Sequence, residues 1–225
     1  MYSPALPQHI GILLFTDFEA LDAFGPLNCL NALSRSFQLR ISIITHSGPS
    51  GKPAHTWPTT PGPQNSHFTQ GVVPTHSFAN SPEDLDLLLV PGGYGVWEET
   101  EEMQAAKDFI RNVYPNLKYM CTICTGSALV AMTGLLDNRK ATSNKRRFKA
   151  IVEKFPRVNW VGAARWVVDG NIYTASGVTA GIDMTLAFIQ DVYGKEHADE
   201  IADRLEYERV LDSRLDVFAA KNGVV

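Results

Sequence analysis

The chain has 225 residues, of which 44% are hydrophobic and 20% are charged, and its formal net charge is −4. This length suits one domain with one core, and the composition is that of an ordinary globular protein. The net negative charge argues against a nucleic-acid partner. The one basic cluster, NRKATSNKRRFK at 138–149, is interpreted as either a solvated helix face or an anion-attracting rim.

Membrane, secretion and metal signals are not found in the sequence. No run approaches the roughly 20 apolar residues of a membrane span, and MYSPALPQHIGILLF has no basic region before its apolar run, so we expect no signal peptide. The three cysteines do not suggest a disulfide framework, which favours a reducing, cytoplasmic setting. We expect no metal and no other cofactor, because ligand clusters and the dinucleotide glycine pattern are missing.

Strands and helices are expected to alternate along the chain. Apolar or β-branched runs predict strands, and apolar residues at helical spacing predict helices. In chain order we expect strand 9–15, helix 21–36, strand 39–47, a Pro-rich segment 49–82, strand 85–93, helix 100–114, strand 117–123, a helix from Gly126 to about Gly134, short strands 140–143 and 158–162 around a helix 145–155, hairpin 166–176, and helices 179–194 and 195–208. This alternation predicts a single α/β sandwich domain around a mainly parallel sheet.

The segment 49–82 is dense in Pro, Gly, Ser and Thr. Loops of this length are uncommon in compact domains and often serve as lids or binding elements. The sequence predicts either a long loop or a hairpin carrying an insertion, and leaves open whether it forms a pocket wall or an inert excursion.

Cys124 follows a predicted strand and precedes a predicted helix, in ICTGS. The carboxyl ends of parallel strands are where ligands bind in α/β sheets. A helix amino terminus is expected to lower the pKa of this thiol, and Gly126 is expected to keep the approach to it open. The geometry is similar to a nucleophile elbow, although a small core residue is the other interpretation.

Three neighbouring features favour chemistry at this edge. Gly92 and Gly93 end another predicted strand and are expected to offer backbone N–H groups to an oxyanion or an anionic substrate. Asp22 lies in the apolar segment EALDAFGP, where it is either a partner of the cysteine or a helix N-cap. Tyr94 and Trp97 are expected either to line the pocket or to cap the following helix.

Two further cysteines have other expected roles. Cys121 forms a CxxC pair with Cys124, and redox or zinc chemistry stays open as a minor alternative. Cys29 lies on the apolar face of a predicted helix, and core packing is its default role.

The chain resembles the ThiJ/PfpI superfamily, which shares a flavodoxin-like core with class I glutamine amidotransferases. The resemblance covers about residues 9–208 and rests on four segments in the family's order: LLFTDFEALDAFGP, DLLLVPGG, ICTGSALVAMTGLLDNRKAT and SGVTAGIDMTLAFI. The isonitrile hydratase branch is the most similar, since it shares the Asp of LDxxGP, the CTGS elbow and TAGID. The tail 209–225 diverges from the family.

The resemblance implies roles for individual residues. Cys124 would be the nucleophile and Asp22 its partner carboxylate. Thr125 would orient substrate or water, and Gly93 corresponds to the family's oxyanion-side glycine. Thr179 follows the family's TAGID pattern and is expected as a possible pocket residue, although a polar helix start also explains it.

One position departs from the family pattern. Relatives usually have a histidine where this chain has Asn144, so a Cys–His pair of the protease or amidotransferase type would lack its base. Hydratase chemistry is less affected, because there the carboxylate moves the protons. Asn144 would instead hydrogen-bond a substrate.

The resulting functional expectation is hydration of an isonitrile to an N-formamide by Cys124 and Asp22. The alternatives are a glyoxalase-like or other enzyme acting on a small-molecule electrophile, and an oxidation or ligand sensor. A regulator is disfavoured because few residues follow 208 for a helix-turn-helix module. The resemblance also implies a homodimer with the pocket close to the interface.

Overall fold

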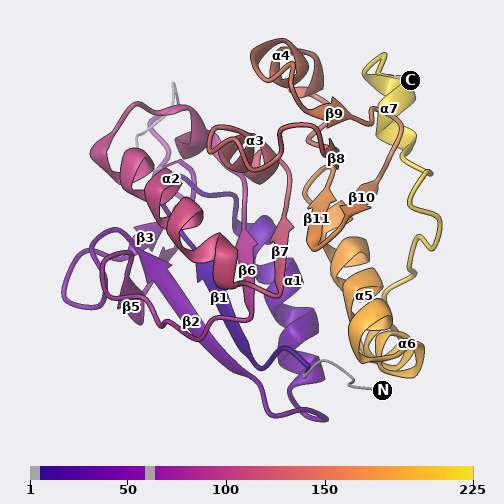
Figure 1. Ribbon diagram of the computed structural model, residues 1–225, viewed down its shortest axis with the longest axis horizontal. Helices are drawn as coiled ribbons and strands as arrows, with labels where there is room; N and C mark the ends of the chain where they lie inside the picture. Colours follow the sequence, from indigo (N-terminus) through magenta and orange to yellow (C-terminus); the bar gives the residue numbers. More distant parts are fainter. Residues whose placement is uncertain (1–5, 59–63, 225) are drawn as a thin grey trace.

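The computed structural model describes residues 6–58 and 64–224, which fold around a seven-stranded sheet (Figure 1). The strand order is β10-β11-β7-β6-β1-β2-β5. Neighbouring strands are parallel except for the antiparallel hairpin of β10 and β11. The strand bounds are β1 His9–Leu13, β2 Arg40–Thr45, β5 His76–Ser77, β6 Leu87–Val90, β7 Tyr119–Thr122, β10 Trp166–Asp169 and β11 Ile172–Ala175.

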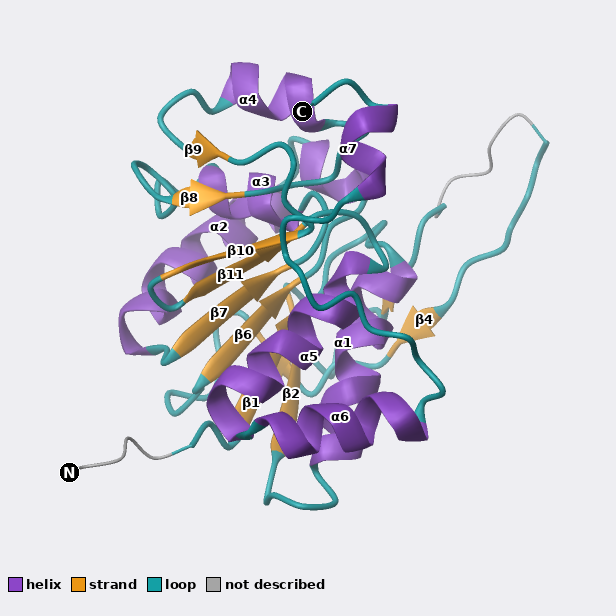
Figure 2. Cartoon of the chain, turned by 90° about the vertical axis from the view of Figure 1, so that its right-hand side faces the viewer, coloured by secondary structure: helices purple, strands orange, loops and turns teal. Residues whose placement is uncertain are grey.

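Helices cover both faces of the sheet (Figure 2). One face carries α1 (Ala20–Leu33), α5 (Ala180–Tyr193) and α6 (Lys195–Arg204), and the other carries α2 (Glu101–Val113) and α3 (Gly126–Ala131). Every residue of β1, β6 and β11 is therefore buried, which is why their sequences are nearly continuous apolar runs. The predicted α/β sandwich with a mainly parallel sheet is confirmed.

The segment 49–82 contains a hairpin. Strands β3 (Ala54–His55) and β4 (Gly71–Val72) pair antiparallel, and β5 then adds to the sheet edge beside β2. Backbone hydrogen bonds tie this hairpin to the loop after β1: Asp17 N–H donates to His55 O (2.9 Å) and Trp57 N–H to Phe18 O (3.1 Å). Residues 59–63 of the segment lie outside the described residues.

The last part of the chain differs from the expectation. The predicted helix 195–208 ends at Arg204, and a helix that was not predicted, α7 (Val217–Lys221), lies in the tail. Its N-cap Asp216 accepts a hydrogen bond from Phe218 N–H (3.0 Å). In both views α7 lies beside α4 (Phe148–Lys154), near the parallel pair of β8 (Lys140–Ala141) and β9 (Asn159–Trp160).

Candidate active site

Cys124 lies at a sharp turn between β7 and α3, with a φ of 56°. A side-chain-bearing residue adopts this left-handed conformation only where the surroundings enforce it. Here its N–H donates to Ala175 O (3.2 Å), and its carbonyl accepts from Ser127 Oγ (3.1 Å) and Ser143 Oγ (3.0 Å). This is the geometry of a nucleophile elbow at the carboxyl edge of the sheet.

Gly126 permits the elbow to pack against the end of β6. A Cβ at this position would lie 2.2 Å from Val90 O and 2.8 Å from Pro91 O, so no larger residue fits without a backbone shift. Gly126 is not among the residues that line the pocket beside Cys124. Its missing side chain therefore serves close packing of the turn rather than access of a substrate.

Asp22 lies in the first turn of α1 and is only 1% exposed. The N-cap of α1 is Glu19, so the N-cap interpretation of Asp22 is wrong. The N–H of Gly92 donates to Asp22 Oδ2 (2.9 Å), while Oδ1 is buried and accepts no hydrogen bond from the described residues. A buried carboxyl with one oxygen unsatisfied is costly when ionised, which indicates a functional group.

The thiol and the carboxyl share one buried environment. Burial raises the pKa of Asp22 to about 8, against smaller lowering effects of the Gly92 N–H and the Cys124 thiol. Burial and then the Asp22 charge raise the pKa of Cys124 well above its usual value. The expectation of a lowered thiol pKa is therefore wrong. Because each group resists ionisation beside the other, near neutrality the pair carries at most one negative charge.

Gly92 is the position where Asp22 and the elbow meet. A Cβ there would lie 2.5 Å from Thr125 Oγ1, 2.6 Å from Thr125 N and 2.9 Å from Asp22 Oδ2. We expect Gly92→Ala to lower stability by about 1–3 kcal/mol, because overpacking forces such atoms apart, and to lower turnover by displacing the carboxyl. Urea denaturation and an activity assay measure both effects. Gly177→Ala is the matched control, since a Cβ at Gly177 meets nothing within 4 Å.

The expected oxyanion donors already have acceptors in this structure. The N–H of Gly92 donates to Asp22, and the N–H of Gly93 donates to Thr125 Oγ1 (3.0 Å). Gly93 has a φ of 151°, and a Cβ on it would lie 2.3 Å from Asp17 O. An oxyanion role of Gly93 stays a prediction that requires its N–H to exchange Thr125 for substrate.

A pocket of about 370 Å³ opens beside Cys124. Among the sequence-predicted residues it is lined by Gly93, Tyr94, Trp97, Thr125 and Asn144, and Asp22 is not among its lining residues. Its further lining residues, which sequence reasoning did not single out, are Glu19, Arg146, Arg147 and Val178. The two arginines belong to the basic cluster at 138–149. The interpretation of that cluster as an anion-attracting rim was the sequence signal that could have identified them.

The segment 49–82 contributes to the outer side of this pocket. The ring of Trp57 stacks on that of Tyr94, with centroids 4.6 Å apart and an interplanar angle of 24°. Since Tyr94 lines the pocket, Trp57 of this segment packs against the wall of the pocket. Thr179, in contrast, is exposed at the start of α5 and does not line the pocket.

Asn144 contacts the nucleophile directly. Its Nδ2 donates to Cys124 Sγ at 3.2 Å, and this hydrogen bond lowers the pKa of the thiol, though less than burial raises it. An amide cannot take the proton of the thiol, so Asn144 orients and stabilises sulfur without acting as a base. None of the described residues that line the pocket is a histidine. The carboxyl groups that act on the Cys124 thiol are those of Asp22 and Glu19, and the effect of Asp22 is the larger.

The sequence profile of the DJ-1/PfpI family matches residues 8–191. This chain belongs to the DJ-1/PfpI family. The resemblance expected from the four sequence segments is thereby confirmed.

Curated members of the family differ in function. An isonitrile hydratase of Pseudomonas putida is 32% identical over 199 residues, which are 88% of this chain and 78% of that protein. The HTH-type transcriptional regulator GbdR of Pseudomonas aeruginosa is 28% identical over 207 residues, which are 91% of this chain and 52% of the regulator. The chain thus spans about half the length of that regulator.

Solved structures of DJ-1/PfpI proteins share the fold. A THiJ/PfpI family protein from Pseudomonas syringae superposes with a TM-score of 0.69 at 24% identity, covering 97% of this chain and 85% of that one. Drosophila melanogaster DJ-1beta superposes with a TM-score of 0.70 at 18% identity, covering 90% of this chain and 100% of that one.

The divergent tail of this family member is anchored directly behind Asn144. Lys145 is 4% exposed, and its Nζ donates to Thr142 Oγ1 (2.6 Å) and Ala164 O (2.6 Å). The tail residue Asp216 places Oδ2 3.7 Å from Nζ and accepts a 2.5 Å hydrogen bond from Ser176 Oγ. Burial lowers the pKa of Lys145 to about 8, although the Asp216 charge acts in the opposite direction. The tail thereby fixes the residue next to Asn144.

Asp183 of TAGID has a similar structural role. Its Oδ2 forms an ion pair with Arg165 (2.6 Å) and accepts from Tyr207 OH (3.1 Å), while Oδ1 accepts from Val210 N–H (2.9 Å). The start of the tail is thus fastened to α5, which explains this carboxylate without catalysis.

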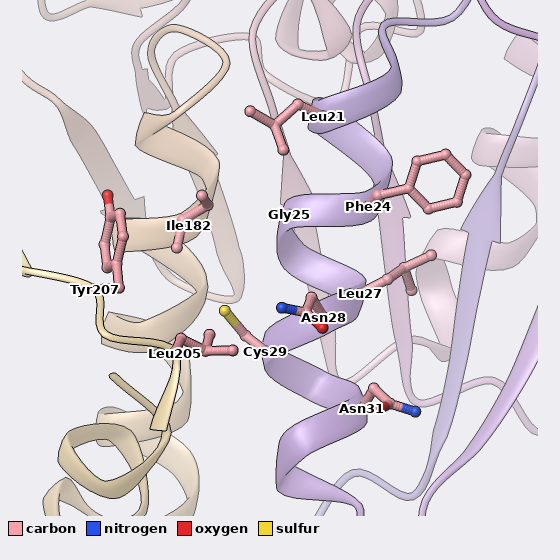
Figure 3. Close-up of a pocket in the computed structure, with 10 residues that line it drawn as sticks. All are labelled: Leu21, Phe24, Gly25, Leu27, Asn28, Cys29, Asn31, Ile182, Leu205 and Tyr207. Atoms are coloured by element: carbon pink, nitrogen blue, oxygen red, sulfur yellow. The ribbon is translucent and has the colours of Figure 1, made fainter. Parts of the chain in front are cut away.

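A second, larger cavity of about 560 Å³ lies between α1 and the α5 side of the molecule (Figure 3). Its lining is mainly apolar and includes the partly exposed Leu21 and Phe24. The sulfur of Cys29 points toward Leu205 in this view, and burial raises the pKa of Cys29 to about 12. Burial likewise raises the pKa of Cys121, and neither of these two thiols lines the pocket of Cys124. The homodimer stays a prediction, which light scattering would test.

The described residues, 6–58 and 64–224, contain no group of three or more His, Cys, Asp or Glu residues placed to hold a metal ion. Within the same residues, no helix has the length and apolar character needed to span a bilayer.

Proposed function

We propose that this protein is a cysteine-dependent hydratase, which adds water to an isonitrile, R–N≡C, to give an N-formamide, R–NH–CHO. The observation that carries the proposal is the buried pair of a pocket-lining thiol, Cys124, and a carboxyl group, Asp22, whose pKa is about 8. The 32% identity to an isonitrile hydratase supports the substrate class.

The first half-reaction uses the pair when it holds a single proton. Asp22 takes the thiol proton as Sγ of Cys124 bonds to the terminal carbon of the isonitrile. Asp22 then gives this proton to the same carbon, and the product is a thioimidate, R–N=CH–S–Cys124. The carboxyl serves as base and then as acid, which its pKa near neutrality suits. The hydrogen bond from Asn144 stabilises negative charge on sulfur.

The second half-reaction hydrolyses the thioimidate. Asp22 takes a proton from water as the water oxygen bonds to the carbon, and passes this proton to nitrogen. The tetrahedral intermediate, R–NH–CH(OH)–S–Cys124, then loses its hydroxyl proton to sulfur as the C–S bond breaks. The formamide leaves and the Cys124 thiol is restored, so that one water is consumed for each isonitrile.

The same site gives less support to the alternatives. Peptidase and glutaminase chemistry relies on a histidine beside the cysteine, and Asn144 occupies the contact with Sγ. An oxidation sensor relies on a high thiolate fraction, and the raised pKa of Cys124 keeps that fraction low.

The test is formamide production from para-nitrophenyl isocyanide, followed by spectroscopy and product mass. We expect turnover by the purified protein and none by Cys124→Ala, because no thioimidate can form. The control is Cys29→Ala, which removes a thiol away from the pocket and is expected to retain turnover.

Retained turnover in Cys124→Ala would rule out the covalent mechanism. No turnover by the wild-type protein, with release of lactate from methylglyoxal instead, would assign the site to glyoxalase-like chemistry.

A further inference from the structure

Two arginines at the pocket of Cys124 form no ion pair with any residue that the structure describes. Arg146 and Arg147 line the pocket and are both exposed. Other arginines of the chain pair with aspartates, for example Arg139 with Asp169 and Arg165 with Asp183. Among the described residues no carboxylate lies within ion-pair distance of either pocket arginine, so both guanidinium groups are available to a ligand.

The position of these arginines is fixed by their neighbours in sequence. Asn144 is held against Cys124 Sγ, and Lys145 is buried under the same segment by Thr142 and Ala164. Arg146 and Arg147, which follow directly in the chain, are therefore held at the pocket. A third positive charge lies nearby, since Lys154 Nζ is 5.4 Å from the centroid of the Trp97 ring, and Trp97 also lines the pocket.

The pocket lining also includes one acidic residue. This residue is Glu19, and burial raises the pKa of its carboxyl. The charge of Glu19 also raises the pKa of both Asp22 and Cys124, so it acts on the reacting pair. The pocket thus combines a carboxyl group that acts on the reacting pair with two arginines from the segment after Asn144.

Such a charge separation orients a ligand that has one anionic end. A carboxylate is repelled by Glu19 and attracted by the two guanidinium groups, whose planar donors match a carboxylate in geometry. The opposite end of the ligand is then presented to Cys124. The pocket lining also includes the apolar surfaces of Tyr94, Trp97 and Val178, which suit an aryl or alkyl group.

We infer that the substrate is a monoanionic isonitrile, with an apolar body, its reactive carbon at Cys124 and a carboxylate at Arg146 and Arg147. This inference rests on the proposed hydratase function for the reaction. It adds a substrate class and assigns specificity to two residues that take no part in the chemical steps. The overall charge of −4 does not favour anions, so the attraction is local to this pocket.

The first test compares 4-isocyanobenzoate with its neutral methyl ester. We expect the wild-type protein to prefer the carboxylate, with a preference that falls as salt rises. In the double variant Arg146→Gln, Arg147→Gln we expect kcat/KM for the carboxylate to fall roughly tenfold, mainly through KM, while the ester changes less than about twofold. Arg35→Gln is the matched control, since Arg35 is exposed at the far end of α1 and should change neither substrate.

The second test does not depend on turnover. Calorimetry measures binding of 4-formamidobenzoate and of its methyl ester to the wild-type protein and to the double variant. We expect the carboxylate to bind more tightly, and the two arginine substitutions to remove the difference. Equal binding of both compounds, or an unchanged preference in the double variant, would overturn the inference.

The two tests separate this inference from the proposed function. Formamide production at equal rates from both isonitriles, with no effect of the arginine variants, would sustain the hydratase and overturn the anionic substrate. No hydration of either isonitrile, together with arginine-dependent binding of the carboxylate, would overturn the hydratase and retain an anionic ligand for this pocket.

Discussion

Replacing Asp22 by Asn is expected to lower turnover by about two to four powers of ten, because the site loses its general acid and base. The same change is expected to stabilise the fold at alkaline pH. In the folded state the pKa of Asp22 is about 8, above its usual 3.8. The wild-type protein therefore loses stability as pH rises from about 4 to about 8, where the buried carboxyl ionises, and Asn does not share this loss.

Urea denaturation at pH 5 and pH 8.5, together with the isonitrile assay, measures both effects. The difference in unfolding free energy between Asp22→Asn and wild type should favour the variant more strongly at pH 8.5. Asp203→Asn is the control, since Asp203 is exposed on α6 and should change neither activity nor pH dependence. An active Asp22→Asn protein, or a stability difference independent of pH, would contradict this account of the site.

Removing the carboxylate of the tail is expected to have the largest effect on stability. Asp216→Ala leaves the buried Lys145 ammonium without its counter-charge, which costs about 3–5 kcal/mol in comparable buried pairs. It also removes the acceptor of Ser176 Oγ and the N-cap of α7. Because Lys145 follows Asn144 in the chain, we expect turnover to fall as well. Thermal denaturation and the isonitrile assay measure these losses.

A compensated variant distinguishes the ion pair from general damage to the tail. Lys145→Met combined with Asp216→Leu removes both charges and is expected to recover much of the stability lost in Asp216→Ala. Should Asp216→Ala be insoluble, Asp216→Asn retains an acceptor for Ser176 and for the helix N-cap while removing the charge. An unchanged melting temperature in Asp216→Asn and in Asp216→Ala would show that the pair does not hold the tail.

The sequence alone determined the architecture and the position of the candidate nucleophile. Apolar runs such as HIGIL and LLLV predicted buried strands because the side-chain pattern of a strand covered on both faces is local and continuous. Cys124 was recognisable since it follows one such run and begins a helix. Asp22 was recognisable because an ionisable group in an apolar segment needs a reason.

Tertiary structure decided the chemistry of these groups. The pKa of the thiol is raised rather than lowered, because burial and the Asp22 charge outweigh the helix terminus, and both come from segments distant in sequence. The hydrogen bond from the Gly92 N–H to Asp22 also depends on the tertiary structure, because the two residues are 70 positions apart in the sequence.

The tail and the pocket rim likewise depend on contacts that no local pattern encodes. The sequence around Asp216 is that of an ordinary surface segment. In the fold, however, Asp216 forms an ion pair with the buried Lys145. By sequence Arg146 and Arg147 are typical of a solvated helix face, but in the fold they line the pocket of Cys124, beside Asn144. Hydrophobic periodicity and turn residues depend on the neighbouring backbone, so the sequence shows them directly. Desolvation and charge pairing depend on which distant segments cover a residue, so they follow only from the tertiary structure. That difference separates the fold, which was readable from the sequence, from the electrostatics of the site.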